Sequence, residues 1–347
     1  MAEREIMANF AVDFENSRIT MNKEYFQTLK SAETEDWLDF HVIRPFCFLL
    51  AKTFARLDIH PNTVTIWSMV VGAASAYFFA QGCFYYEGAW GLMMNLIAIL
   101  LLMVADVLDC TDGQLARLTG KKSHLGRILD GIAGVAWFTP IYHALVWRFY
   151  QHHELEFSLL GISDTPENTA IATAVVYVLG FISGLGGLGA QQRLADYYIQ
   201  VHLFFLKGEK NSELDNSRRQ QEILSQMGAD TPWYERLFQK SYVEYTRKQE
   251  RRTPQLQRLM DRLRERFGSA DAMPEAEREA FHARSLALMK WNGLLTFNFR
   301  SAWLFLFCLL DVPAMNFVFE IVAMGLLAWW VNRRHESFSR EIADRLD

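Results

Sequence analysis

Long apolar runs are the feature that most restricts what this chain can fold into. The 347 residues contain such runs at roughly 64–81, 89–105, 131–147, 169–189, 302–310 and 314–331. Most of them approach the ~20 apolar residues that a helix needs to cross a bilayer. The run at 302–310 reaches that length only if WNGLLTFNFRS (291–301) is included, which brings Arg300 inside. A soluble all-α protein is the alternative, and so many long apolar runs in one chain argue against it.

The charges indicate an orientation. Residues 1–33 contain no apolar segment of the kind found in a signal peptide, so we expect the N-terminus to stay in the cytoplasm. The predicted outer turns, 81–88, 150–169 and 311–314, contain no Lys or Arg. The predicted inner segments contain Lys121, Lys122, Lys207, Lys210, Arg333 and Arg334. This asymmetry follows the positive-inside rule, and six spans would return the C-terminus to the cytoplasm.

We therefore predict an all-α integral membrane protein with six transmembrane helices, an N-terminal interfacial amphipathic helix and a cytoplasmic helical insert. A polar tail occupies 1–33. The interfacial helix and the first four spans occupy 34–205, the charged insert 206–290, and the last two spans with the C-terminal tail 291–347.

Two of these segments allow a second interpretation. The stretch 34–57 is amphipathic and contains Pro45, so it either lies in the inner interface or packs on its own chain. In the insert, prolines at 232, 254 and 274 mark helix starts. Its dense arginines either touch anionic headgroups or form an ordinary salt-bridged surface, which we favour.

The stretch DVLDCTDGQLARLTGKKSHLGRILDGIAGV (106–135) concentrates carboxylates at the end of a span. Asp109 and Asp112 are three residues apart and share a helix face, and Asp106 lies three residues further back. Ionisable groups in such a position are costly and indicate function. Paired carboxylates are ligands that Mg²⁺ or Mn²⁺ prefers. Asp130, on the next helix, is placed to complete a metal site.

The neighbouring residues suit a phosphate. Gly113 allows a ligand to approach the backbone, and Arg117 can grip a phosphate by two hydrogen bonds. Gly126 lets the next helix begin close to its neighbour. The alternative is that the acids only pair with nearby Lys and Arg to organise the turn, but this does not explain the glycines. The sequence therefore predicts a metal and phosphate site that opens to the cytoplasm.

These residues carry a resemblance. Seven positions, Asp109, Asp112, Gly113, Ala116, Arg117, Gly126 and Asp130, match in type and spacing the signature of the CDP-alcohol phosphotransferase family, the membrane enzymes of phospholipid synthesis. The stretch Pro61-Asn62-Thr63-Val64-Thr65 also resembles the family's sequence before the first span. The resemblance covers residues 34–205 well and the last two spans loosely, and leaves 206–290 unexplained.

The resemblance implies an activity. A CDP-linked donor would bind two divalent cations, Mg²⁺ or Mn²⁺, held by Asp109, Asp112 and Asp130. A hydroxyl acceptor would take the substituted phosphate, with release of CMP. Gly113, Ala116, Arg117 and Gly126 would surround the nucleotide and its phosphates; Asn62 and Thr65 either join that pocket or only begin a helix. The resemblance also implies a homodimer among membrane lipids, and we expect no nucleic-acid partner.

The signature breaks at its last position. The family has a fourth aspartate, assigned to deprotonating the acceptor, where this chain has Gly134. Another group can supply the base, with Asp130, Asp106 and His124 as local candidates, or the metals can lower the pKa of the hydroxyl enough. Otherwise the chain is a catalytically impaired CDP-lipid-binding protein of the same fold, or carries a substitution at a catalytic position.

Arg300 and the placement of the acids each allow an alternative interpretation. Arg300, inside the predicted fifth span, either contacts an acceptor in its pocket or forms a structural pair with Glu320. A transporter would spread its acids through the depth of the bilayer, whereas these cluster at one edge. We favour CDP-diacylglycerol as the donor, on the compact six-span layout, and the sequence does not name the acceptor.

Overall fold

The structure is a computed structural model that describes Tyr25, Thr28 and residues 39–346, apart from 122, 209–211, 213, 229 and 271. The predicted polar tail and the first residues of the predicted interfacial helix therefore lie outside the described residues, except for Tyr25 and Thr28. Every regular element of the described chain is helical. The fold class is thus all-α.

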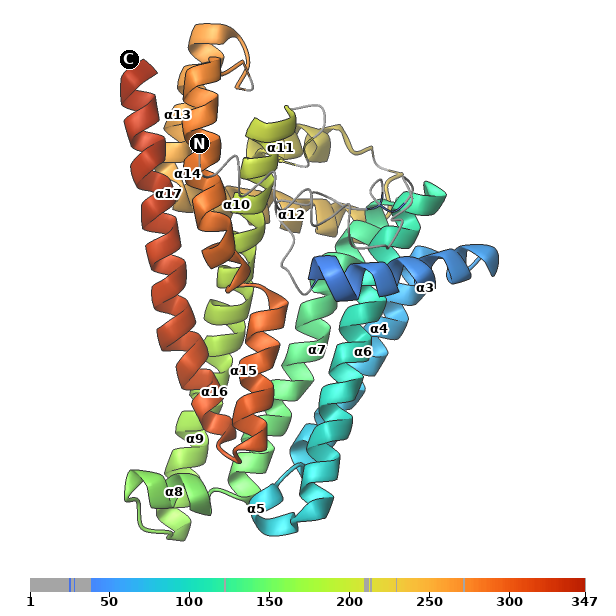
Figure 1. Ribbon diagram of the computed structural model, residues 1–347, viewed down its shortest axis with the longest axis vertical. Coiled ribbons are helices and arrows are strands. Elements are labelled where there is room, and N and C mark those ends of the chain that lie inside the picture. The colour runs from blue at the N-terminus through green and yellow to red at the C-terminus, as the bar shows by residue number, and fades with distance from the viewer. Residues whose placement is uncertain are drawn as a thin grey trace, which may run out of the picture.

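Long helices form a tall bundle, and short helices close its lower end and cover its upper end (Figure 1). The long elements are α4 (Pro61–Gln81), α6 (Ala89–Thr119), α7 (His124–Gln151), α9 with η2 and α10 (Pro166–Ile182, Ser183–Leu188, Gly189–Lys207), and α16 with η4 and α17 (Pro313–Phe319, Glu320–Met324, Gly325–Leu346). The shorter ones are η1 (Asp39–Ile43), α3 (Arg44–Arg56), α5 (Phe84–Glu87), α8 (Glu154–Leu160) and α15 (Phe297–Leu309). The predicted amphipathic helix changes from η1 to α3 at Arg44, the residue before Pro45.

Four of the described helices are long and apolar enough to cross a membrane: Pro61–Gln81, Ala89–Thr119, Pro166–Lys207 and Pro313–Leu346. They expose large apolar side chains, such as Leu100, Phe181 and Leu326, each more than 60% exposed. Soluble monomers rarely expose apolar surface on this scale. The chain is therefore an integral membrane protein, and the count of six spans stays a prediction.

No continuous helix runs through 291–310, the stretch in which the fifth span is predicted. Helix α14 ends at Gly293, a turn follows, and α15 begins only at Phe297. The 13 residues of α15 make a helix about 20 Å long. This is shorter than the ~30 Å hydrocarbon core of a bilayer, so α15 does not reach across it alone.

Close packing of α4 on α7 sets the frame for the functional site. A Cβ built on Gly72 of α4 would lie 2.2 Å from Cδ1 of Trp137 in α7, so only glycine fits there. The indole Nε1 of Trp137 donates a hydrogen bond of 3.0 Å to the Ser68 carbonyl. Small residues allow membrane helices to approach closely, which here brings the start of α4 beside α7.

A buried polar cluster connects the helices at the opposite, lower end of the bundle. Arg148 donates to the Asn95 side chain (2.9 Å) and the Cys308 carbonyl (2.7 Å), and forms an ion pair with Asp311. The Asp311 carboxylate accepts hydrogen bonds from the backbone N–H groups of Phe84 (3.0 Å) and Tyr85 (2.7 Å). The cluster joins the α4–α6 hairpin, α7 and the α15–α16 turn.

Glu156, in α8, lies near this cluster. Its Oε1 accepts a hydrogen bond of 2.9 Å from the backbone N–H of Ala314, and its Oε2 has no partner in the described structure. Burial raises the pKa of Glu156 to about 7, against the opposing effect of that N–H and of Arg148. The folded protein therefore binds the proton of this carboxyl more tightly than an ordinary glutamate does.

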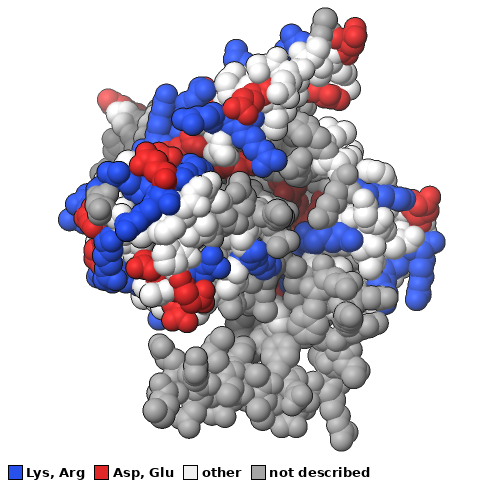
Figure 2. Space-filling model, turned by 90° about the horizontal axis from the view of Figure 1, so that it is seen from above, with Lys and Arg blue, Asp and Glu red and all other residues white. Residues whose placement is uncertain are grey.

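The segment predicted as an insert forms α11 (Ser217–Gln226), α12 (Trp233–Arg252), α13 (Pro254–Phe267) and α14 (Glu275–Gly293) at the upper end of the bundle (Figure 1). The last three begin at or directly after the three prolines, as predicted. Seen from above, Lys and Arg mix with Asp and Glu over this end (Figure 2). Several of the arginines form ion pairs with neighbouring acids, as in Arg264–Asp261 and Arg284–Glu341, which fits the salt-bridged surface.

Candidate functional site

The predicted acids lie where α6 ends and α7 begins. Gly120 ends α6 with a φ of +69°, a left-handed conformation that favours glycine. Ser123 then caps α7, because its hydroxyl accepts a hydrogen bond of 2.9 Å from the N–H of Gly126. This turn reverses the chain, so α7 returns beside α6 and brings Asp130 within electrostatic range of Asp109 and Asp112.

The carboxylates of Asp109 and Asp112 differ in their surroundings. Asp112 is buried and accepts a hydrogen bond from the Thr65 hydroxyl of α4. The Oδ1 of Asp109 is buried and has no hydrogen-bond partner in the described part of the chain. A buried carboxylate oxygen without a donor is costly, so it calls for a cation or a proton.

The start of α4 packs against the start of α7. A Cβ on Gly126 would lie 2.9 Å from Oδ1 of Asn62, and the Ser123 hydroxyl lies 3.4 Å from the same oxygen. Asn62 therefore approaches the backbone of α7 closely through Gly126. His60 caps α4, since its Nδ1 accepts from the N–H of Asn62 at 3.2 Å. The cap belongs to His60, which leaves the Asn62 and Thr65 side chains directed to α7 and α6.

Gly113, Ala116 and Arg117 lie on the last turns of α6. A Cβ on Gly113 would lie 3.4 Å from Nη2 of Arg117, so the guanidinium lies over the glycine. The Nε of Arg117 donates a hydrogen bond of 2.5 Å to the carbonyl of Thr28. Ala116 is partly buried one turn after Asp112. Arg117 thus borders the acids and also contacts the N-terminal segment.

The remaining candidates, Asp106, His124 and Arg300, differ from this group in their surroundings. Asp106 interacts with Asp109 but also lies close to Asp39 and Arg44. The His124 side chain lies outside the described residues. Arg300 is fully buried, 3.0 Å from Oε2 of Glu320, and donates to the Gln191 side chain at 2.7 Å. The structure therefore places Arg300 in the structural pair, the second of its two interpretations.

Gly134 faces α10. A Cβ at this position would meet only Oε1 of Gln192, at 3.8 Å, so the space for a larger side chain is present. No sequence motif marks Gln192, because only the tertiary fold brings it near Gly134. Tyr245, which Asp130 influences electrostatically, carries no motif either.

The acids suit a divalent cation, although they are not gathered around one point. Within the described side chains, no three His, Cys, Asp or Glu residues form a preassembled metal cluster. However, the unsatisfied oxygen of Asp109, the oriented carboxylate of Asp112 and the nearby Asp130 are all hard oxygen donors. The donor set therefore fits Mg²⁺ or Mn²⁺ better than a softer metal.

Comparison with known proteins agrees with this chemistry. Residues 58–183, which contain all of these acids, match the family model described as CDP-alcohol phosphatidyltransferase. The archaetidylinositol phosphate synthase of Pyrococcus horikoshii is 36% identical over 81 residues, which are 23% of this chain and 37% of that protein. The match thus covers little more than a third of that relative. No solved structure matches the chain. Residues 58–183 form a domain of the CDP-alcohol phosphatidyltransferase family.

Proposed function

We propose that the chain transfers a phosphatidyl group from a CDP-linked lipid, CDP-diacylglycerol in our preferred form, to a hydroxyl acceptor, with release of CMP. The observation that carries the proposal is the buried, unsatisfied Oδ1 of Asp109 beside Asp112 and Asp130. Such an arrangement is costly unless cations bind there during the protein's work. The family match supports the same reaction.

In this proposal Asp109, Asp112 and Asp130 hold two divalent cations, Mg²⁺ or Mn²⁺. When bound, the cations neutralise the diphosphate and stabilise the phosphate of the leaving CMP. Thr65 fixes the Asp112 carboxylate through its hydroxyl. Arg117 lies over Gly113, where it can hold a phosphate against the backbone. Asn62, Ala116 and Gly126 border the nucleotide.

The acceptor oxygen attacks the phosphorus that carries the lipid, the bond from that phosphorus to the CMP oxygen breaks, and the acceptor loses its proton. Gly134 cannot take this proton. Asp130, Asp106 and His124 are the candidates that we propose for this role. The second candidate function is CDP-lipid binding without turnover, which the missing acid favours.

The relative's name suggests one class of acceptor. It denotes synthesis of archaetidylinositol phosphate, so phosphorylated polyols belong in any acceptor panel beside glycerol phosphate and serine. We also propose that the site faces the cytoplasm, as the charge asymmetry of the turns indicates, and that the chain forms a homodimer.

CMP release tests the proposal. Purified protein is given CDP-diacylglycerol, Mg²⁺ or Mn²⁺ and a panel of acceptors, with Asp112→Asn and Gly134→Asp beside the unmodified chain. Release that needs an acceptor, and that both EDTA and Asp112→Asn abolish, is the expected result. Release only from Gly134→Asp would mean that the missing acid alone prevents turnover. If neither releases CMP but CDP-diacylglycerol still binds, the binding function is correct.

A further inference from the structure

Helix α12 lies at the upper end of the bundle, against α10 (Figure 1). Two hydrogen bonds fix it there. The Gln249 side chain donates to the Arg193 carbonyl at 3.2 Å, and the guanidinium of Arg252 donates to the Ala190 carbonyl at 3.3 Å. The signature motif does not include any of this segment, so α12 is an addition of this chain to the site.

Tyr245 is a residue of α12 that Asp130 influences electrostatically. The guanidinium of Arg193 lies 5.9 Å from the centre of its ring, and Tyr242 stacks on it at 5.9 Å. Burial raises the pKa of Tyr245, and the carboxylates of Asp196 and Asp130 raise it further. The tyrosine hydroxyl therefore lies within electrostatic range of a proposed metal ligand.

Arg193, which lies over the Tyr245 ring, and Arg252 differ from the other arginines of this region in their charge partners. Arg193 and Arg252 are close enough to repel each other. Across the ranges that the structure describes, neither forms an ion pair, whereas many arginines of the same helical segment do. Two neighbouring guanidinium groups without acids attract an anion with several oxygens.

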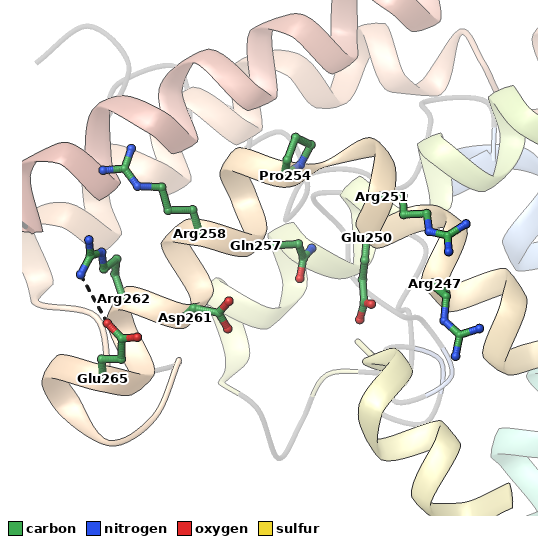
Figure 3. A pocket seen from close by; sticks show the side chains of 9 residues that line it. All are labelled: Arg247, Glu250, Arg251, Pro254, Gln257, Arg258, Asp261, Arg262 and Glu265. Carbon is green, nitrogen blue, oxygen red and sulfur yellow. Dashed lines mark hydrogen bonds and ion pairs between the residues drawn. The ribbon is translucent and has the colours of Figure 1, made fainter.

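A second group of arginines lies on the opposite side of α12 and provides a comparison. Arg247, Arg251, Arg258 and Arg262 line an open pocket between α12 and α13, together with Glu250, Asp261 and Glu265 (Figure 3). These acids neutralise much of its charge, as the Arg262–Glu265 pair shows. Arg251 is thus the sequence neighbour of Arg252 but belongs to another surface.

We propose that α12 completes the site, with Tyr245 as a positioning residue that holds the Arg193 guanidinium so that Arg193 and Arg252 bind a phosphate group of a substrate. This inference rests on the proposed function. The phosphate belongs either to the CDP-linked donor or to a phosphorylated acceptor, and kinetics distinguish the two. The insert is then part of the active site of this chain.

The test compares Arg252→Gln with Arg251→Gln, and Tyr245→Ala with Tyr245→Phe. CMP release is measured while donor and acceptor are varied separately. Losing a charge-assisted hydrogen bond costs about 1.5–3 kcal/mol, which corresponds to a rise in KM of at least about tenfold. We expect that rise for one substrate in Arg252→Gln and Tyr245→Ala, with kcat nearly unchanged. Tyr245→Phe keeps the ring over Arg193 and should recover most of the affinity. The substrate whose KM rises carries the phosphate.

A second measurement separates this inference from the proposed function. Inorganic pyrophosphate is titrated with EDTA present, and the melting temperature is followed. We expect a rise in the full chain and in Arg251→Gln, and none in Arg252→Gln or Arg193→Gln. If the chain releases no CMP but still shows this melting pattern, the anion site is supported and only the proposed transferase activity is refuted. Equal behaviour of Arg252→Gln and Arg251→Gln in both assays would overturn the inference.

Discussion

Arg300→Met should destabilise the protein without impairing the chemistry of its site. Arg300 and Glu320 are each about 1% exposed, and their charged groups lie 3.0 Å apart. Removing one partner of a buried pair costs about 3–5 kcal/mol, because the other charge is left uncompensated. The Glu320 carboxylate keeps hydrogen bonds from Tyr142, Ser183 and Asn316. Because these donors still compensate part of the charge of Glu320, we expect the free energy of unfolding to fall by about 3 kcal/mol.

A double-mutant cycle provides the assay. Unfolding free energies are measured in detergent for Arg300→Met, Glu320→Gln and the double variant. Since the neutral glutamine no longer needs the guanidinium, the double variant should recover at least half of the loss, a coupling of about 1.5 kcal/mol or more. CMP release per folded molecule should stay within about twofold, because Arg300 contacts none of the three proposed metal ligands.

Two results would refute this reasoning. Additive effects in the cycle would show that the 3.0 Å pair carries no coupling energy. A stable Arg300→Met variant with a raised KM for the acceptor would return Arg300 to the acceptor pocket, the first of its two interpretations.

Three further predictions concern single contacts. Gly126→Ala should lower the unfolding free energy by about 1–3 kcal/mol, because its Cβ would overlap Asn62 at 2.9 Å. Gly131→Ala, with nothing within 4 Å, should gain up to about 1 kcal/mol. Thr65→Val should raise the metal concentration for half-maximal CMP release about tenfold, because it removes the hydroxyl that orients the metal-binding Asp112. The raised pKa of Glu156 means that the folded state binds this proton more tightly, so stability should fall by about 3 kcal/mol as pH rises from 4.5 to about 7.

Each of these predictions can be contradicted by a specific result. Equal melting temperatures for the Gly126 and Gly131 variants would show that the close approach to α4 is absent. An unchanged metal titration in Thr65→Val would mean that Asp112 needs no orienting group. Glu156→Gln should flatten the difference in stability between pH 4.5 and 7; the same slope in both proteins would assign the pH dependence to another group.

Local patterns explain how the acids come to lie near one another, and their role stays a prediction. The three-residue spacing of Asp109 and Asp112 sets one helix face, and Gly120 with Ser123 supplies the turn that brings Asp130 back. Other contacts are not local. The hydroxyl of Thr65 reaches Asp112 across 47 positions, so its role followed only from the packing of α4 on α6.

Sequence reasoning was weakest for the last third of the chain. Apolar composition gave no sign that a turn divides 291–310, because WNGLLTFNFRS holds only one glycine and no proline. The charged composition of 206–290 predicted helices, but it did not predict which helices of the bundle they contact. Tyr245 and Arg252 come from the part of the chain that resembles no family pattern, and only tertiary structure brings them to Arg193.

The two buried polar contacts made by the last helices have a consequence for assembly. Asp311 contacts Arg148, and Glu320 contacts Ser183 and the Gln191 side chain. These earlier residues therefore find their partners only when residues more than a hundred positions later have been translated. Hydrophobicity gives membrane helices little reason to choose one depth or rotation over another. Here Asp311, in the turn between α15 and α16, and Glu320, directly after α16, each meet a buried polar partner on an earlier helix. The last helices can therefore make both contacts only when they dock at the correct height.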